Sequence, residues 1–234
     1  MDKQLREQIK HDKFVEEVTH TVDYLQHHQA QVKKYGGIVA AVLVLGVGAY
    51  AFMNYQASKR QEDLRQASLV LDAFVGPQNP TGGQAFPTQA DKDAAAYKAF
   101  SEVATKHSGS REGDLARYSA STILCDTGKV SECEAGLKQV AASSDKNIAS
   151  LGKLSLATLY VAQKKVDQAE PLLRDLVANP TTVVSKEQAQ ISFAKAIYKT
   201  KRQEAEIILK SLQALDRPAI TRAAVSVLGE MMNQ

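Results

Sequence analysis

No charged side chain occurs between Lys34 and Lys59, and most residues in this interval are apolar. As an α-helix, residues 36–55 measure roughly 30 Å at about 1.5 Å per residue, which is the thickness of a bilayer's hydrocarbon core. Tyrosines stand at both ends, where amphipathic rings prefer the headgroup level. The sequence therefore predicts one membrane-spanning helix over residues 35–56. Its expected membrane-interface anchors are Lys33, Lys34, Tyr35, Tyr55, Lys59 and Arg60.

A cleaved signal peptide is the alternative for this segment, because Ala49, Tyr50 and Ala51 form a small-x-small cleavage pattern after an apolar run. Signal peptides total about 15 to 30 residues, however, whereas this apolar run begins only at residue 36. We therefore expect the segment to be retained as a membrane anchor.

Residues 1–34 form a polar N-terminal tail that contains a narrow apolar pattern with alternating spacings of three and four. Such spacing places the apolar side chains on one face of an amphipathic helix. This face either binds a partner or the membrane surface, or belongs to a partly formed helix without a fixed partner. The expected tail interaction seam consists of Val15, Val18, Val22, Leu25 and Val32.

Three further segments follow the predicted span. Residues 57–75 are mostly polar at first and apolar towards their end, which is consistent with a helix that leaves the membrane. Residues 76–92 contain three prolines and three glycines, which predicts a long loop. The remainder, residues 93–234, is rich in helix-forming residues and contains an internal repeat.

The repeat has a constant period of 36 residues without gaps. The segments GKVSECEAGLKQV, KKVDQAEPLLRDL and TKRQEAEIILKSL begin at Gly128, Lys164 and Thr200. A small residue is followed by a large one four positions later and another three positions after that, which defines one helix face. An amphipathic helix precedes each segment, so the repeating unit is a helix pair. The aligned columns are Cys133, Ala169 and Ala205; Leu137, Leu173 and Leu209; and Val140, Leu176 and Leu212.

These units resemble tetratricopeptide repeats. Tyr160, Ala169, Leu173 and Pro180 follow the Tyr, Ala, Phe, Pro order of the second half of that pattern. The first half departs from it, because the chain has no Trp and the period is 36 instead of about 34. The expected fold is all-α, with one transmembrane helix followed by a right-handed array of antiparallel helix pairs.

The layout as a whole resembles the ancillary SecYEG translocon subunit family. The resemblance rests on the tail DKFVEEVTHTVDYLQHHQAQVKKYG, the span with LGVGAYAF and the small repeat domain after it. It implies a bacterial inner-membrane protein with a cytoplasmic tail and periplasmic repeats. It also implies three kinds of protein partner: translocon subunits, a membrane-anchored prolyl isomerase chaperone and secreted clients.

The charges beside the span do not decide its orientation. Lys33 and Lys34 precede it, whereas Lys59, Arg60 and Arg65 follow it. Basic residues tend to remain in the cytoplasm, but this rule leaves the orientation undecided here or slightly favours the opposite of the expected topology. The orientation comes from the resemblance alone.

The first helices of tetratricopeptide-like pairs line a concave surface that commonly binds peptides. In this chain that surface is expected to be apolar and uncharged, which suits extended or helical segments of a partner. The alternative for each of its residues is packing between repeats, because the inner faces serve both purposes. The expected groove residues are Leu115, Tyr118, Thr122, Leu154, Thr158, Val161, Gln190, Ile197 and Tyr198.

Cys125 and Cys133 are the two cysteines of the chain. Their number and spacing exclude a disulfide framework and a paired zinc motif. Two alternatives remain: a single disulfide in an oxidising compartment, or two buried free thiols.

Composition and motifs argue against several functional classes. With 29 basic and 26 acidic side chains the surface is mixed, so nucleic acid is not an expected partner. No catalytic constellation, metal site, cofactor or small-molecule substrate is indicated. We expect a non-enzymatic, membrane-anchored scaffold that binds proteins at the secretion translocon and links it to periplasmic chaperones. The alternative is a structural or oligomerisation component of another envelope assembly.

Overall fold

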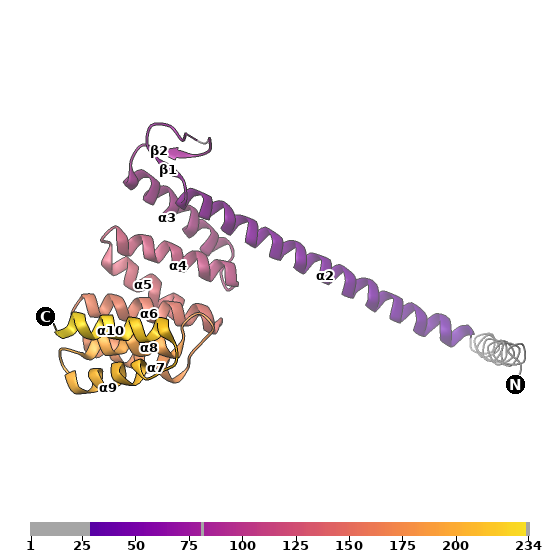
Figure 1. Cartoon of the computed structure of the whole chain (residues 1–234). Coiled ribbons are helices and arrows are strands. Elements are labelled where there is room, and N and C mark those ends of the chain that lie inside the picture. Colours follow the sequence, from indigo (N-terminus) through magenta and orange to yellow (C-terminus); the bar gives the residue numbers. More distant parts are fainter. Residues whose placement is uncertain (1–28, 81, 233–234) are drawn as a thin grey trace, which may run out of the picture. The chain divides into compact units, whose positions relative to one another are not determined.

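The computed structural model describes residues 29–80 and 82–232 (Figure 1). Apart from one short strand pair, its regular elements are helices, so the predicted all-α fold is confirmed. The helices are α2 (Gln29–Leu71), α3 (Gln89–Lys106), α4 (Arg111–Asp126), α5 (Val130–Ala141), α6 (Lys146–Ala162), α7 (Val166–Ala178), α8 (Lys186–Ile197), α9 (Arg202–Gln213) and α10 (Pro218–Met232). The strands are β1 (Phe74–Val75) and β2 (Ala85–Phe86).

The chain divides into two compact units between Ser58 and Lys59. The described part of the first unit belongs to α2, whose apolar side chains are exposed; Tyr50, for example, is 74% accessible. This helix includes a stretch long and apolar enough to cross a membrane, with a mean hydropathy of 2.1. Contiguous exposed apolar surface of this extent is rare in soluble proteins. It is typical of a segment surrounded by lipid.

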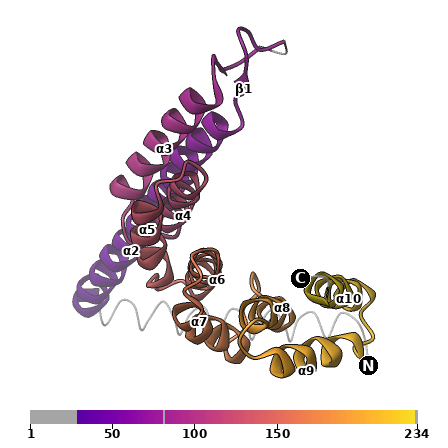
Figure 2. The same cartoon turned by 90° about the vertical axis from the view of Figure 1, so that its left-hand side faces the viewer.

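The second unit, from Lys59 onward, is a helical array in which each helix from α3 to α10 packs against the next (Figure 2). In addition, α4 contacts α6, α6 contacts α8 and α8 contacts α10. We call α4, α6, α8 and α10 the inner helices, and α3, α5, α7 and α9 the outer helices. Neighbouring inner helices form one layer, and the outer helices alternate with them along the chain.

The face predicted from the 36-residue repeat is the buried face of the outer helices. All nine residues of the three aligned columns are buried, and so are Ala96, Phe100 and Val103 of α3. Small side chains at Cys133, Ala169 and Ala205 allow the neighbouring helix to approach closely. The periodicity of the sequence therefore correctly predicts the packing surface of the outer helices.

The array begins earlier in the sequence than residue 93. Leu64, Ala67 and Val70 of α2 pack with Ala96 and Phe100 of α3, and Ala67 is only 2% exposed. The end of α2 is thus the first helix of the array, and residues 72–88 connect the two members of a helix pair. The Pro- and Gly-rich composition of this loop makes it resemble a boundary between domains in the sequence.

Two features shape the loop between α2 and α3. Strands β1 and β2 pair in parallel, with Phe74 opposite Ala85. Helix α3 begins at Gln89 because the Thr88 hydroxyl accepts a hydrogen bond from the Asp91 backbone N–H at 3.1 Å. Such a side-chain cap satisfies an N–H group that would otherwise lack a partner at the helix start. The regular structure therefore resumes four residues before residue 93.

Candidate partner-binding surface

Seven of the nine predicted groove residues lie on the inner helices α4, α6 and α8 and are at least partly accessible. Thr158 is exposed, whereas Leu115, Tyr118, Thr122, Leu154, Val161 and Gln190 are half-buried. Tyr118 of α4 and Leu154 and Val161 of α6 also pack against the main hydrophobic core. Part of each side chain is therefore structural, and part remains available at the surface.

A direct contact joins the inner helices α4 and α6 within this region. The Tyr118 hydroxyl lies 3.2 Å from the Ser155 hydroxyl, and either group can donate the hydrogen bond. On the same helix as Ser155, the Thr158 hydroxyl donates to the Leu154 carbonyl at 2.9 Å. The surface offered by α4 and α6 is apolar with scattered hydroxyl groups.

Ile197 and Tyr198 do not line an open groove. Ile197 is 0% exposed and Tyr198 is 8% exposed, and both belong to the main core. The Arg202 guanidinium lies over the Tyr198 ring at 5.3 Å from its centroid. Within the described residues the Tyr198 hydroxyl is buried without a hydrogen-bond partner. The expectation that Ile197 lines the groove does not fit this burial, because its side chain is enclosed in the core.

Ion pairs on the outer helices recur with the same period as the repeat. Glu134, Glu170 and Glu206 occupy one column of the alignment, and each pairs with a cation four residues later. These cations are Lys138, Arg174 and Lys210. Pairs at this spacing face each other on a helix and contribute about 0.2–0.5 kcal/mol each. The column was visible in the sequence as Glu-x-x-x-Lys or Arg in all three units.

The Glu170–Arg174 ion pair belongs to a larger network that joins helices α7 and α9. Lys201 donates to Glu170 at 2.6 Å, and Arg174 reaches Glu204 at 2.8 Å. The pKa of Glu170 is lowered, chiefly by the hydrogen bond from Lys201 and then by that from Arg174. The network is partly accessible to solvent, so its main effect is to fix the register of neighbouring outer helices.

A second ionic contact lies within the helix pair α6–α7. Lys153 donates to Asp175 at 2.6 Å, and this hydrogen bond is the main cause of the lowered pKa of Asp175. Ser150, also on α6, lies 2.8 Å from the Thr181 hydroxyl in the segment after α7. These contacts hold the far end of α7 onto α6 and are structural in character.

In the structure a disulfide joins Cys125 at the end of α4 to Cys133 in the first part of α5, with their Cα atoms 5.1 Å apart. It therefore links an inner helix to the outer helix that follows it, across the turn at Gly128. Cys133 is fully buried. Its sulfur occupies the small-residue column, so the bridge lies inside the helix contact.

The remaining predicted residues fall at the beginning of the chain. Val15, Val18, Val22 and Leu25 lie outside the described residues. Val32 and Lys33 lie in α2, where the structure describes the backbone alone.

Of the predicted anchors with described side chains, Lys34, Tyr35, Tyr55 and Lys59 are exposed on α2. Arg60 instead pairs with Glu112 of α4 at 3.2 Å. Arg60 therefore connects the end of α2, the first helix of the array, to the inner helix α4.

Within the described part of the chain, no group of three or more His, Cys, Asp or Glu side chains lies together as metal ligands. No curated protein and no solved structure matches the chain. The sequence model of the tetratricopeptide repeat-like domain family matches residues 30–216, which include the apolar part of α2 as well as the helices up to α9. The paired helices and the buried small-residue column of the chain agree with this match. The chain therefore belongs to the tetratricopeptide repeat-like domain family, as the match shows.

Proposed function

We propose that this protein is a non-enzymatic, membrane-anchored scaffold that binds segments of other proteins on its inner helices. The observation that carries the proposal is the partly accessible apolar surface of Tyr118, Leu154 and Val161 on α4 and α6. Tetratricopeptide repeat-like domains generally mediate protein–protein interactions, and α2 supplies a segment suited to a membrane. An apolar surface with few charges suits extended or helical apolar segments of a partner.

The proposed location is the bacterial inner membrane, with the array in the periplasm and the tail in the cytoplasm. This orientation follows from the resemblance to ancillary translocon subunits, since the charges beside the span leave it undecided. The Cys125–Cys133 disulfide supports it independently. Disulfides persist in the periplasm and are reduced in the cytosol.

The proposed partners follow from the same resemblance. They are subunits of the secretion translocon, a membrane-anchored prolyl isomerase chaperone and polypeptides that emerge from the translocon. A chain entering the periplasm is unfolded and exposes apolar segments, which is the chemistry that the surface of α4 and α6 accepts. The scaffold would hold such a chain close to the membrane and bring a chaperone to it.

Site-specific photo-crosslinking in intact membranes tests this function. A photoreactive amino acid is placed at Thr158 on inner helix α6, and a control is placed at Ile207 on outer helix α9, which is 62% exposed. We expect Thr158 to crosslink to translocon subunits, the chaperone or secreted polypeptides, and Ile207 to do so much less. Equal yields at both positions would exclude this surface. Crosslinks confined to copies of the same chain would favour an assembly component instead.

A further inference from the structure

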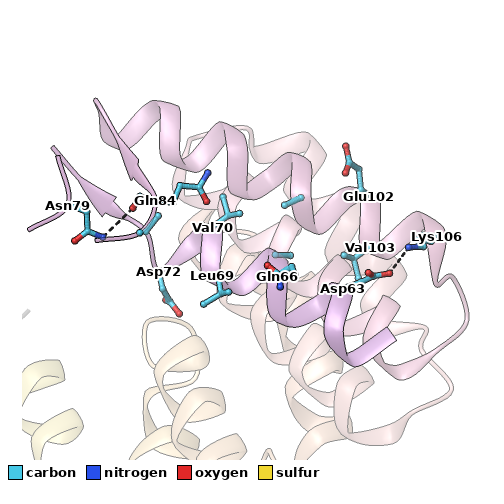
Figure 3. A pocket seen from close by; sticks show the side chains of 14 residues that line it. Asp63, Gln66, Leu69, Val70, Asp72, Asn79, Gln84, Glu102, Val103 and Lys106 are labelled. Atoms are coloured by element: carbon cyan, nitrogen blue, oxygen red, sulfur yellow. Dashed lines mark hydrogen bonds and ion pairs between the residues drawn. The ribbon is translucent and has the colours of Figure 1, made fainter. Parts of the chain in front are cut away.

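A groove of about 600 Å³ lies between α2 and α3 at the beginning of the array (Figure 3). Ala67 and Val70 of α2 and Val103 of α3 form part of its apolar lining. The loop residues Asn79 and Gln84 lie at one end, and the ion pair between Asp63 and Lys106 lies at the other (Figure 3). All of these residues belong to the second unit.

A comparable hollow occurs one repeat later, between α3, α4 and α5. Its lining from α4 has the spacing 0, 3, 4, 7, at Arg117, Ala120, Ser121 and Leu124. The lining of the groove from α2 includes the same spacing, at Asp63, Gln66, Ala67 and Val70, together with Leu69. The two hollows are thus built on corresponding faces of consecutive helices in the array.

The outer helices of the two repeats also contribute corresponding positions. If Ala96 and Phe100 of α3 are aligned with Cys133 and Leu137 of α5, then Ala99 and Glu102 correspond to Gly136 and Gln139. Ala99 and Glu102 line the groove at α2, and Gly136 and Gln139 line the hollow at α4. The two hollows therefore share corresponding lining positions on both of their helices, α2 with α4 and α3 with α5.

The two hollows differ in their third wall. At α4 that wall is helix α3, which contributes Tyr97, Ser101, Ala104 and Thr105. Each later inner helix likewise packs against the outer helix that precedes it. Among the described residues no helix precedes α2 in this position. In the array the element at the corresponding position is an α-helix, and three of its four lining residues, Ser101, Ala104 and Thr105, are small.

The rim of the groove is acidic. Asp63 pairs with Lys106 and His107, and these hydrogen bonds, that from Lys106 foremost, lower the pKa of Asp63. Asp72 and Glu102 also line the groove and form no ion pair within the described chain. Leu69 also lines the groove and is 49% exposed. An occupant with basic side chains next to its small apolar face would complement both features.

We propose that the groove between α2 and α3 docks an amphipathic α-helix of another protein, which presents small side chains to Ala67 and Ala99 and Lys or Arg to Asp72 and Glu102. The docked helix takes the place that α3 takes against α4. This surface is separate from that of the inner helices α4 and α6. It gives the scaffold a second binding site for a folded, helical partner.

The test uses the full-length protein in its native membranes, with a photoreactive amino acid at Gln66, an exposed position of the groove lining. The expected product is a crosslink to a different protein, with the attached residues spaced three or four apart in a helix that also carries Lys or Arg. Thr158 is tested in the same membranes, so that failure of the groove and failure of the inner surface are observed separately.

Charge variants complete the experiment. The double variant Asp72→Asn with Glu102→Gln should lower the Gln66 crosslink yield about fivefold, since two exposed charge pairs contribute about 1 kcal/mol together. Asp126→Asn, an exposed acid at the end of α4 outside the groove, should leave the yield unchanged. The inference is overturned by any of four results: a yield no higher than at Ile207, a crosslink to a second copy, attachment within a non-helical segment, or no effect of the double variant.

Discussion

Gly152 of α6 lies so close to the end of α5 that a Cβ added to it would be 2.5 Å from the Ala141 backbone nitrogen. A backbone atom cannot move aside as a flexible side chain can. Gly152→Ala should therefore destabilise the array by about 1–3 kcal/mol, although alanine favours a helix over glycine by about 1 kcal/mol. The thermal unfolding midpoint of the full-length protein in detergent measures the change.

Gly229→Ala on α10 is the matched control for this substitution, because no atom lies within 4 Å of the added Cβ. Here helix propensity acts alone, and we expect the midpoint to stay the same or rise. If both variants melted at the same temperature, the close contact between α5 and α6 would be excluded.

Ala169→Leu tests the small-residue column of the repeat. Ala169 is fully buried on α7, so three additional carbons must displace a neighbouring helix. We expect a loss of about 1–3 kcal/mol, or roughly 2–4 °C per kcal/mol in a domain of this size. Gln168→Leu on the exposed face of the same helix should change the midpoint little. An unchanged midpoint in Ala169→Leu would contradict the repeat alignment.

The disulfide between Cys125 and Cys133 predicts both a thiol count and a stability difference. Protein extracted without reductant and unfolded in denaturant should offer no thiol to a maleimide reagent, and reduction should expose two. The chain-entropy estimate for so short a loop is about 2.5 kcal/mol of stabilisation, which reduction should remove. Cys125→Ala should melt at the same temperature with and without reductant. Two reactive thiols in the unreduced, unfolded protein would exclude the disulfide and remove its support for a periplasmic array.

Asp63 predicts the pH dependence of the contact between α2 and α3. Because its pKa in the folded protein is lowered from 3.8, chiefly by Lys106, the carboxylate stabilises the fold above pH 3.8. That stabilisation is lost as the pH falls through the lower folded value. Asp63→Asn should lower the melting point at pH 7 by a few degrees, for a loss of about 1 kcal/mol, and the difference from the natural protein should shrink towards pH 3. A constant difference across this range would exclude the charge as the cause.

Thr158 and Val161 separate binding from folding on α6. Thr158→Asp places a charge on the exposed part of the apolar surface and should reduce partner crosslinking from a photoreactive amino acid at Thr122 of α4, without a shift in melting temperature. Val161 packs against the core, so Val161→Asp should reduce both. If Thr158→Asp had no effect on crosslinking, the partner would bind elsewhere.

The outer helices could be predicted from the sequence because their small, large, large pattern repeats at a fixed spacing. Ala169, Leu173 and Leu176 pack as this pattern indicates. The sequence does not reveal the end of α2 as part of the array, because a loop of seventeen residues separates α2 from its partner helix α3. Local periodicity carries no information about a contact across a loop of variable length.

The inner helices were harder to interpret, for a physical reason. Helices α6 and α8 each contact two outer helices and two inner helices, so Val161 and Ile197 look alike in sequence although one is partly accessible and the other is buried. The prediction for the two cysteines was limited in a similar way, since their spacing alone allowed either a bridge or two free thiols. Helix geometry at the turn places the two Cα atoms at a distance suited to a bridge.

Ile123 and Leu124 are neighbours on α4, yet Ile123 belongs to the core shared with α2 and α3 and Leu124 to the core of the later helices. This one helix thus seals two separate interiors. A soluble fragment that began at residue 93 would strip Leu64, Ala67 and Val70 from the first interior and leave Phe100 open to water. The smallest fragment suited to crystallisation or binding studies therefore begins near Lys59, where the charges that follow the apolar stretch already provide solubility.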